Sequence, residues 1–175
     1  MKNKVFAICG STKQSSTNKS LLNAIAALTN DKFEIEIFSG IDQLPHFNPD
    51  IDNETPPGPV EAFRRKLKQA DAILICTPEY AMGVPGSLKN AIDWTVSSCE
   101  FSHKPTALIT ASSQGFKGHA SLLETLKVIE ANVTDETQLI ISFVKTKIGN
   151  NIITDVETQT KVLKVMDALG SLIVG

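Results

Sequence analysis

The sequence is poor in the features that mark several large classes of protein. It has three cysteines, an odd number without a CxxC pair, which argues against a framework of paired disulfides. No apolar run approaches the roughly 18 residues needed to span a membrane, and the chain enters an apolar strand segment without a signal-peptide core. The formal net charge of −2 lacks the basic excess of a nucleic-acid surface. We therefore expect a reduced, cytoplasmic protein that binds neither nucleic acid nor membrane.

Histidines with metal-ligand spacing are missing as well. His46, His103 and His119 are scattered along the chain, so we predict no metal site. The densest basic cluster lies within Arg64–Lys68, on a segment with the pattern of an exposed helix face, and we interpret it as a solvated surface. With 175 residues, 42% of them hydrophobic and 21% charged, the chain has the size and balance of one globular domain spanning 1–175.

What the sequence does contain is a regular alternation of strand and helix patterns. Apolar runs predict buried strands at 4–9, 72–76, 106–111 and 138–144, and alternating apolar and acidic residues predict an edge strand at 33–38. Helices are predicted at 18–29, 59–69, 86–97, 118–131 and 155–172. This alternation predicts an α/β fold with a doubly wound five-stranded parallel sheet, strand order 2-1-3-4-5 and helices on both faces.

One long connection, residues 39–58, is punctuated by prolines and has no helical pattern. Long loops in compact domains are usually functional or disordered. Leu44 and Phe47, placed among stiff prolines, favour an ordered loop that covers part of the molecule. A simple surface excursion fits the pattern nearly as well, so the sequence leaves both alternatives open.

The first strand segment leads into a loop with the character of an anion site. Gly10 ends the apolar run, and a stretch rich in hydroxyl side chains follows before the first helical pattern. A helix N-terminus there would offer unpaired N–H groups and roughly +0.5 charge. An ordinary helix cap would explain one or two of the hydroxyls but not all of them. We therefore predict phosphate binding by Ser11, Lys13, Ser16, Thr17 and Asn18.

Two common phosphate motifs are absent from this loop. G-x-x-x-x-G-K-[ST] does not occur, and G-x-G-x-x-G is excluded because Gly10 is the only glycine before Gly40. The close backbone approach that a dinucleotide pyrophosphate needs is therefore not provided. A terminal monophosphate suits the hydroxyl-rich loop better, and FMN is the common cofactor of that kind on a doubly wound sheet. Another phosphorylated ligand remains an alternative.

The loops after the third and fourth strands should lie beside this loop, because ligands bind at the carboxyl ends of the strands in such sheets. The first of them, 77–90, contains two glycines and two prolines, and Tyr80 and Met82 add apolar surface. Backbone donors beside apolar side chains suit a planar heteroaromatic ring, although a rigid connector in which Pro85 opens the helix is equally consistent. The other loop, 112–119, is a small glycine-containing turn with little signal by itself.

Sequence blocks around these loops resemble the NADPH-dependent FMN reductase family. They are Gly10-Ser11-x-Lys13-x-x-Ser16-x-Asn18, Thr77-Pro78-Glu79-Tyr80 and Pro85-Gly86-x-Leu88-Lys89-Asn90-Ala91-Ile92-Asp93-Trp94. The loop Leu44-Pro45-x-Phe47-Asn48-Pro49-Asp50 and the turn Ser112…Gly115…Gly118 also match, so the resemblance spans 4–170. It implies a flavodoxin-like fold, an FMN cofactor and NADPH or NADH as hydride donor. It also implies a homodimer or homotetramer in which the helix starting at Pro85 contributes to the interface.

The reaction implied by the resemblance is ping-pong hydride transfer from NAD(P)H through FMN to a small-molecule acceptor. The acceptor would be a quinone, an azo or nitro compound, or free flavin, and no catalytic acid or base is assigned. A non-catalytic FMN carrier or redox-sensing module is the alternative. The implied cofactor-binding residues are Ser11, Lys13, Ser16, Thr17, Asn18, Pro78, Glu79, Tyr80, Ala81, Gly83, Ser112 and Gly115.

The sequence departs from the family pattern in three places. Lys13 stands where arginine is usual, so a planar bidentate group is replaced by a point charge. Ala81 replaces the asparagine that commonly follows the Glu-Tyr pair, and Lys117-Gly118-His119 replaces a Gly-Gly pair. We expect the fold to be retained, with effects on FMN affinity and on the contacts of the 112–119 loop. We expect Glu79 to have a structural rather than a catalytic role.

Overall fold

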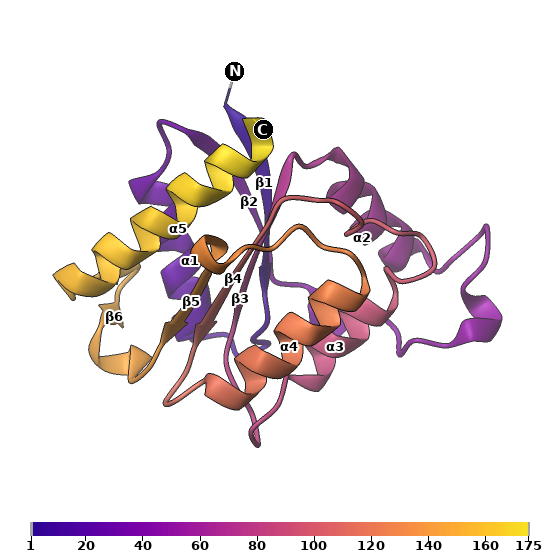
Figure 1. Cartoon of the computed structure of the whole chain (residues 1–175). Helices are drawn as coiled ribbons and strands as arrows, with labels where there is room; N and C mark the ends of the chain where they lie inside the picture. Colours follow the sequence, from indigo (N-terminus) through magenta and orange to yellow (C-terminus); the bar gives the residue numbers. More distant parts are fainter. Residues whose placement is uncertain (1, 175) are drawn as a thin grey trace.

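A five-stranded parallel sheet lies at the centre of the molecule, between two layers of helices (Figure 1). The computed structural model describes residues 2–174. The strands are β1 (Asn3–Cys9), β2 (Phe33–Phe38), β3 (Ala72–Thr77), β4 (Thr106–Ala111) and β5 (Gln138–Ile141). Their order, β2-β1-β3-β4-β5, confirms the predicted doubly wound topology.

Helices cover both faces of this sheet. They are α1 (Thr17–Leu28), α2 (Gly58–Gln69), α3 (Gly86–Asp93), α4 (Phe116–Val128) and α5 (Val156–Val174). The first and last helices, α1 and α5, pack on one face, whereas α2, α3 and α4 pack on the other (Figure 1). Among the described residues, no helix has both the length and the apolar character needed to cross a lipid bilayer.

Alternate residues of the central strands point into two separate cores. In β1, Val5 and Ala7 join the core beneath α1 and α5. Phe6 and Ile8 join the core beneath α2, α3 and α4. All four side chains are almost completely buried, which explains why the strand is a continuous apolar run. β2 lies at the edge of the sheet with its acidic residues exposed, which confirms the predicted edge strand.

The strand predicted at 138–144 is shorter in the structure and ends at Ile141. Phe143 has a φ of 55°, in the left-handed region, so the chain turns out of the sheet there. A short 3-10 helix, η4 (Val144–Thr146), follows the turn. The prediction was wrong at this end because Val144 is buried in the α1 and α5 core, so the apolar run continues beyond the strand.

A hairpin that was not predicted from the sequence connects η4 to α5. β6 (Ile148–Gly149) pairs with β7 (Ile152–Ile153) through Asn150 and Asn151, whose φ values of 50° and 61° fit a type I′ turn. The Oδ1 atom of Asn151 accepts a hydrogen bond from Ser20 Oγ at 3.0 Å. This bond fastens the hairpin to α1, the helix that begins at the predicted phosphate loop.

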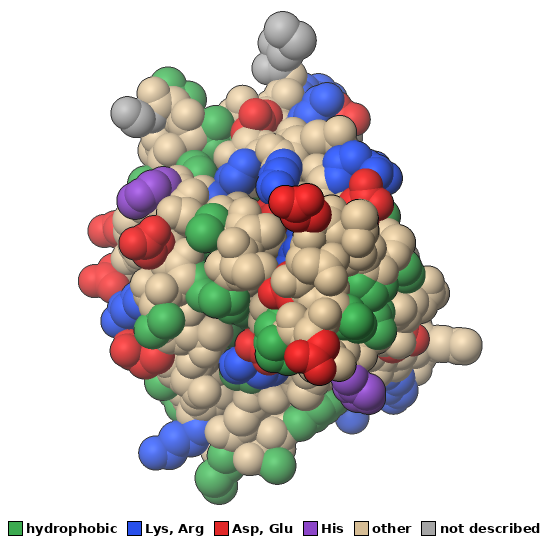
Figure 2. Space-filling model, turned by 90° about the vertical axis from the view of Figure 1, so that its right-hand side faces the viewer, with side chains coloured by type: hydrophobic (Ala, Val, Ile, Leu, Met, Phe, Trp, Pro, Cys, Tyr) green, Lys and Arg blue, Asp and Glu red, His purple; other side chains and the backbone are tan. Residues whose placement is uncertain are grey.

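The basic segment of α2 is only partly the solvated surface that its pattern indicated. Arg64 is buried, with Nη2 2.6 Å from Asp52 Oδ1 and Nε donating to the Trp94 carbonyl at 2.6 Å. Burial of Asp52 raises its pKa, but hydrogen bonds to Arg64 and Ser97 and the guanidinium charge bring the pKa below its usual value. On the face drawn in Figure 2, basic side chains are interspersed with acidic ones.

The same arginine helps to end α3, which stops at Asp93 rather than at the predicted residue 97. Its Nε donates a hydrogen bond to the Trp94 carbonyl, as cationic side chains often do at a helix C-terminus. The Thr95 hydroxyl donates to the Ile92 carbonyl at 2.7 Å, so side chains take hydrogen-bonding groups that a longer helix would use.

Residues 39–57 form an ordered loop that covers one edge of the core beneath α2, α3 and α4. Leu44 is buried, and the rings of Phe47 and Trp94 meet edge to face with their centroids 5.1 Å apart. The Pro45 carbonyl accepts a hydrogen bond from Trp94 Nε1 at 2.8 Å. The structure therefore favours the covering loop over a surface excursion, and it places Trp94 in the core.

Candidate cofactor site

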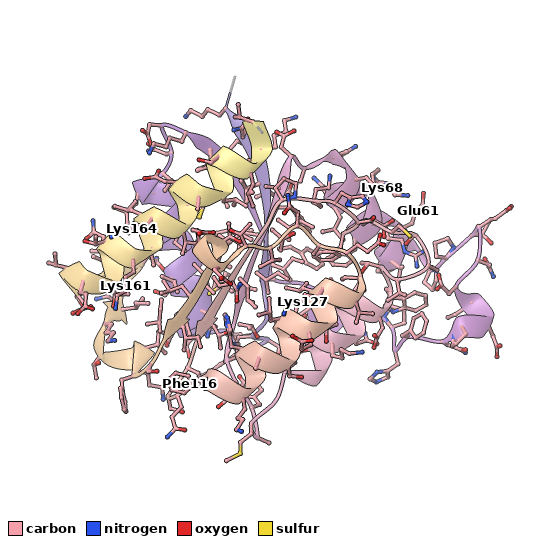
Figure 3. The ribbon with its side chains drawn as sticks, viewed as in Figure 1. Glu61, Lys68, Phe116, Lys127, Lys161 and Lys164 are labelled. Atoms are coloured by element: carbon pink, nitrogen blue, oxygen red, sulfur yellow. The ribbon has the colours of Figure 1, made fainter. Side chains whose placement is uncertain are left out.

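A cleft of about 590 Å³ opens at the carboxyl edge of the sheet. Its walls come from the loops after β1, β3, β4 and β5, at the end of the molecule where α4 begins at Phe116 (Figure 3). Known small-molecule sites have volumes of roughly 300–1,000 Å³. The position is the one expected for a ligand of a doubly wound sheet, at the point where the strand order reverses.

Nine of the twelve predicted cofactor-binding residues line this cleft: Ser11, Lys13, Ser16, Thr17, Asn18, Pro78, Glu79, Tyr80 and Ser112. The other three, Ala81, Gly83 and Gly115, lie outside its lining. Ala81 is at the tip of a turn, Gly83 closes that turn, and Gly115 caps α4. These three residues shape the backbone of two loops and do not form the surface of the cleft.

One end of the cleft lies at the start of α1. Ser16 caps this helix, and its Oγ accepts a hydrogen bond from Lys19 N at 3.3 Å. The helix provides no partner for the N–H groups of its first turn, which include those of Thr17 and Asn18. Lys13 adds a positive charge to the same wall, and the first turn of α1 carries no acidic residue. Hydroxyls, backbone N–H groups and a lysine form the donor set that a phosphate requires.

The Asn18 side chain has a structural role in addition to its place in the lining. It is buried, its Nδ2 donates to the Ala111 carbonyl at 3.1 Å, and its Oδ1 lies 3.2 Å from Cys76 Sγ. Burial raises the pKa of the Cys76 thiol well above its usual value, so the neutral S–H can donate to this oxygen. Asn18 thus holds the start of α1 against β3 and β4, and its backbone N–H remains for a ligand.

A second wall is formed by Pro78, Glu79 and Tyr80. They belong to a segment, residues 78–83, that we call the strap. The strap is a tight turn in which Tyr80 N donates to Gly83 O at 3.1 Å and Gly83 N donates to Tyr80 O at 2.9 Å. The two central residues, Ala81 and Met82, have φ values of 49° and 60°, the geometry of a type I′ turn. Tyr80 lines the cleft and is 53% exposed, so the strap presents apolar surface at the mouth of the cleft. Met82, at the tip of the turn and outside the lining, is 73% exposed.

The strap is fastened to the loop after β4 and to the helix that follows it. The Glu79 carboxylate accepts a hydrogen bond from Gly118 N, with Oε2 and N 2.6 Å apart. The Ser112 hydroxyl donates to the Glu79 carbonyl at 3.5 Å. Gly118 belongs to the segment that departs from the family pattern, and this segment retains a close contact with the strap. The expected structural role of Glu79 agrees with these hydrogen bonds.

A further wall of the cleft was not predicted from the sequence. It consists mainly of Phe143, Val144, Lys145 and Thr146, which follow β5. Single residues beside the predicted ones, Ser15, Ala111 and Ser113, complete the lining. The rule that ligands bind beyond the carboxyl ends of the strands also points to the loop after β5, although we applied it only to the loops after the first, third and fourth strands.

The two ends of the cleft fit the two ends of FMN. The hydroxyls, N–H groups and lysine at α1 suit a terminal phosphate. Exposed rings on two different loops of the lining, Tyr80 at 53% and Phe143 at 68%, suit a planar heteroaromatic group. Residues that would hold FMN are therefore present at both ends of one cleft.

Comparisons with known proteins support the same cofactor. The family model described as NADPH-dependent FMN reductase matches residues 3–146. A NAD(P)H:quinone oxidoreductase of Solanum tuberosum is 31% identical over 179 residues, which cover 97% of this chain and 92% of that protein. A NAD(P)H-dependent FMN reductase of Pseudomonas aeruginosa is 35% identical over 144 residues, which cover 79% of this chain and 77% of that protein.

A solved structure is similar over nearly the whole chain. FerB, a flavoenzyme NAD(P)H:(acceptor) oxidoreductase from Paracoccus denitrificans, has a TM-score of 0.79 at 25% identity, covering 98% of this chain and 97% of that one. The matches confirm the predicted flavodoxin-like fold and the predicted class, an oxidoreductase that uses FMN and NAD(P)H. This chain belongs to the NADPH-dependent FMN reductase family.

Proposed function

We propose that the protein transfers hydride from NADPH or NADH through FMN to a quinone, an azo or nitro compound, or free flavin. The hydride donor and the acceptor would bind in turn at the same open face of the flavin, which is a ping-pong mechanism. The observation that carries this proposal is a single cleft that has hydrogen-bond donors for a phosphate at α1 and exposed apolar rings at its mouth. FMN, when bound, supplies the two-electron redox chemistry.

The role of the protein's own residues is to bind and orient. Ser11, Ser16 and Lys13 would hold the phosphate together with the backbone N–H groups of the first turn of α1. The strap and Ser112 would hold the ring. We assign no catalytic acid or base, because the Glu79 carboxylate is already bonded to a backbone N–H.

The experiment that tests this function uses purified protein incubated with FMN, desalted, and mixed anaerobically with NADPH or NADH. We expect retained flavin absorption bands that bleach rapidly with at least one donor and return when a soluble quinone is added. Steady-state rates at varied donor and quinone concentrations should give parallel double-reciprocal lines. Retained bands that do not bleach would support a non-catalytic FMN carrier, and intersecting lines would contradict the ping-pong mechanism.

We further propose a cytoplasmic homodimer or homotetramer in which α3 contributes to the interface. Leu88 and Ile92 of this helix are buried in the chain's own core, so an interface on this side would use the outer surface of α3. Lys89 is exposed there, and Val96 beyond the helix is 52% exposed. Light scattering of the purified protein gives its mass directly, and a monomer at micromolar concentration would contradict the proposal.

A further inference from the structure

We propose that Glu79 is a positioning residue for FMN. Its carboxylate caps α4 in place of the side chain that Gly115 lacks, and it thereby fastens the strap to the first turn of α4. The two ring-binding walls are thus held in place before the cofactor binds. This inference rests on the proposed function, because it concerns how the same cleft receives the flavin ring.

The first step is the unusual start of α4. Its N-cap residue is Gly115, with a φ of 100° and no side chain to accept a hydrogen bond from the first turn. Helices usually begin with serine, threonine, aspartate or asparagine at this position. Gly118 is the third residue of α4, and its N–H is one of the groups that the helix leaves unpaired.

The partner of this N–H comes from a different loop. Glu79 Oε2 lies 2.6 Å from Gly118 N, although the two residues are 39 positions apart. A carboxylate at a helix N-terminus is favoured by the helix dipole as well as by the hydrogen bond. Glu79 therefore supplies the cap that the local sequence of α4 does not provide.

Close packing supports the same contact from the helix side. A Cβ atom added to Gly118 would lie 3.0 Å from the Gly83 carbonyl oxygen and 3.1 Å from Glu79 Cγ. Both neighbours belong to the strap. Because a Cβ atom at these distances would force them to shift, glycine at 118 allows the strap to rest directly on α4.

The contact bears on the ring end of the cleft and not on the phosphate end. Glu79 lines the cleft, its carbonyl accepts from the Ser112 hydroxyl at 3.5 Å, and Ser112 lines the cleft as well. The phosphate end is built separately, from the loop after β1 and the first turn of α1. Displacing Glu79 should therefore disturb the ring and leave the phosphate contacts in place.

The test compares binding of FMN and of riboflavin, which has the ring but no phosphate, to the ligand-free protein by flavin fluorescence. Glu79→Ala should weaken both ligands by a similar factor of about tenfold or more, since charge-assisted hydrogen bonds are among the stronger ones. Glu79→Gln keeps an acceptor oxygen and should recover part of the loss. Gly118→Ala should reproduce the effect from the opposite side of the contact.

Asp155→Ala is the matched control. The Asp155 carboxylate accepts a hydrogen bond from Thr158 N at 2.8 Å near the start of α5, on the other face of the sheet. Its loss should lower the free energy of unfolding without changing either dissociation constant. Hydrogen exchange of the ligand-free proteins adds a readout without cofactor, and Glu79→Ala, unlike Asp155→Ala, should speed exchange of the Gly118 amide.

Several results would overturn the inference. Unchanged riboflavin affinity in Glu79→Ala would do so, as would weaker FMN binding without weaker riboflavin binding. If Glu79→Ala does not fold, wild-type riboflavin affinity in both Glu79→Gln and Gly118→Ala would have the same meaning. Failure of the wild-type protein to bind either flavin would instead refute the proposed function, so the two failures are distinguishable.

Discussion

At the scale of single residues, the tip of the strap is strained, although it lies outside the cleft lining. Ala81 and Met82 both have left-handed φ values, a conformation that favours glycine and asparagine. Strain of this kind costs about 1–3 kcal/mol per residue and persists only where other contacts impose it. Here the paired hydrogen bonds between Tyr80 and Gly83 impose it.

Replacing Ala81 should relieve part of this strain. We expect Ala81→Gly and Ala81→Asn each to raise the free energy of unfolding by about 0.5–1 kcal/mol, since neither glycine nor asparagine is penalised in a type I′ turn. Urea denaturation measures the change. Ala62→Gly is the matched control, because it lies inside α2 and should lower the free energy of unfolding by a similar amount. A loss of stability in both Ala81 variants would contradict the strain argument.

Lys13 lines the cleft at a position where the family pattern has arginine. We expect Lys13→Arg to bind FMN as tightly as the wild-type protein or more tightly, because a guanidinium can hold two phosphate oxygens at once. Lys13→Ala should weaken FMN binding by about tenfold. Lys127→Ala, on α4 away from the cleft lining, should change nothing (Figure 3). Fluorescence titration measures the FMN affinity of each variant. A marked loss of affinity in Lys13→Arg would mean that Lys13 does not face the phosphate.

At the scale of elements, the start of α1 is both the proposed phosphate site and a point where the helix is held to the sheet. Ser16 caps the helix and Asn18 ties it to β4, so the double variant Ser16→Ala/Asn18→Ala removes both contacts. We expect FMN affinity to fall by more than about tenfold, and the free energy of unfolding to fall by about 1–3 kcal/mol. Titration and urea denaturation measure the two effects. An unchanged FMN dissociation constant would reject the phosphate site.

The β-sheet side of α4 contains a buried histidine that makes stability depend on pH. His119 Nδ1 lies 2.9 Å from Thr110 Oγ1, and Nε2 lies 3.3 Å from Gln138 Oε1. Burial lowers the pKa of His119 from its ordinary value of 6.5, and the hydrogen bond to Gln138 only partly offsets this. The folded protein therefore keeps a neutral imidazole at pH values where the unfolded chain binds a proton.

This difference fixes the sign of the pH dependence. The contribution of neutral His119 to the free energy of unfolding is fully present above about pH 6.5. It is lost as the pH falls through the lowered pKa of the folded state. The change is at most about 1.4 kcal/mol per pH unit for one proton. Urea denaturation from pH 8 to pH 5 should show this loss in the wild-type protein, and His119→Gln should lack it. Identical pH profiles would contradict the prediction.

At the scale of the whole molecule, the cleft is assembled from four loops that only the folded sheet brings together. Unfolding should therefore release FMN if it binds in this cleft, as we propose. We expect FMN at a hundred times its dissociation constant to raise the free energy of unfolding by about 2.7 kcal/mol. Urea denaturation at several FMN concentrations checks the magnitude, with adenosine monophosphate as a control ligand. Equal stabilisation by the control would indicate a general phosphate site.

The fold could be predicted from the sequence, and the loop that we propose for the phosphate could be identified there, because both signals are local. Strands buried on both faces are continuous apolar runs, and a parallel sheet of such strands has few arrangements. The loop after β1 carries its hydroxyls, its lysine and the start of α1 within one short segment. Hydrophobic periodicity and residue spacing were sufficient for these features.

Tertiary structure alone decided the contacts between distant segments. Arg64 has the pattern of a surface residue, but its partner Asp52 lies in the 39–57 loop and its acceptor carbonyl lies at the end of α3. Glu79 caps a helix that begins far along the chain from it. The residue pattern of a segment shows which of its side chains face the core. The free energy of a buried charge or of a helix cap, however, depends on a partner that only folding brings within reach.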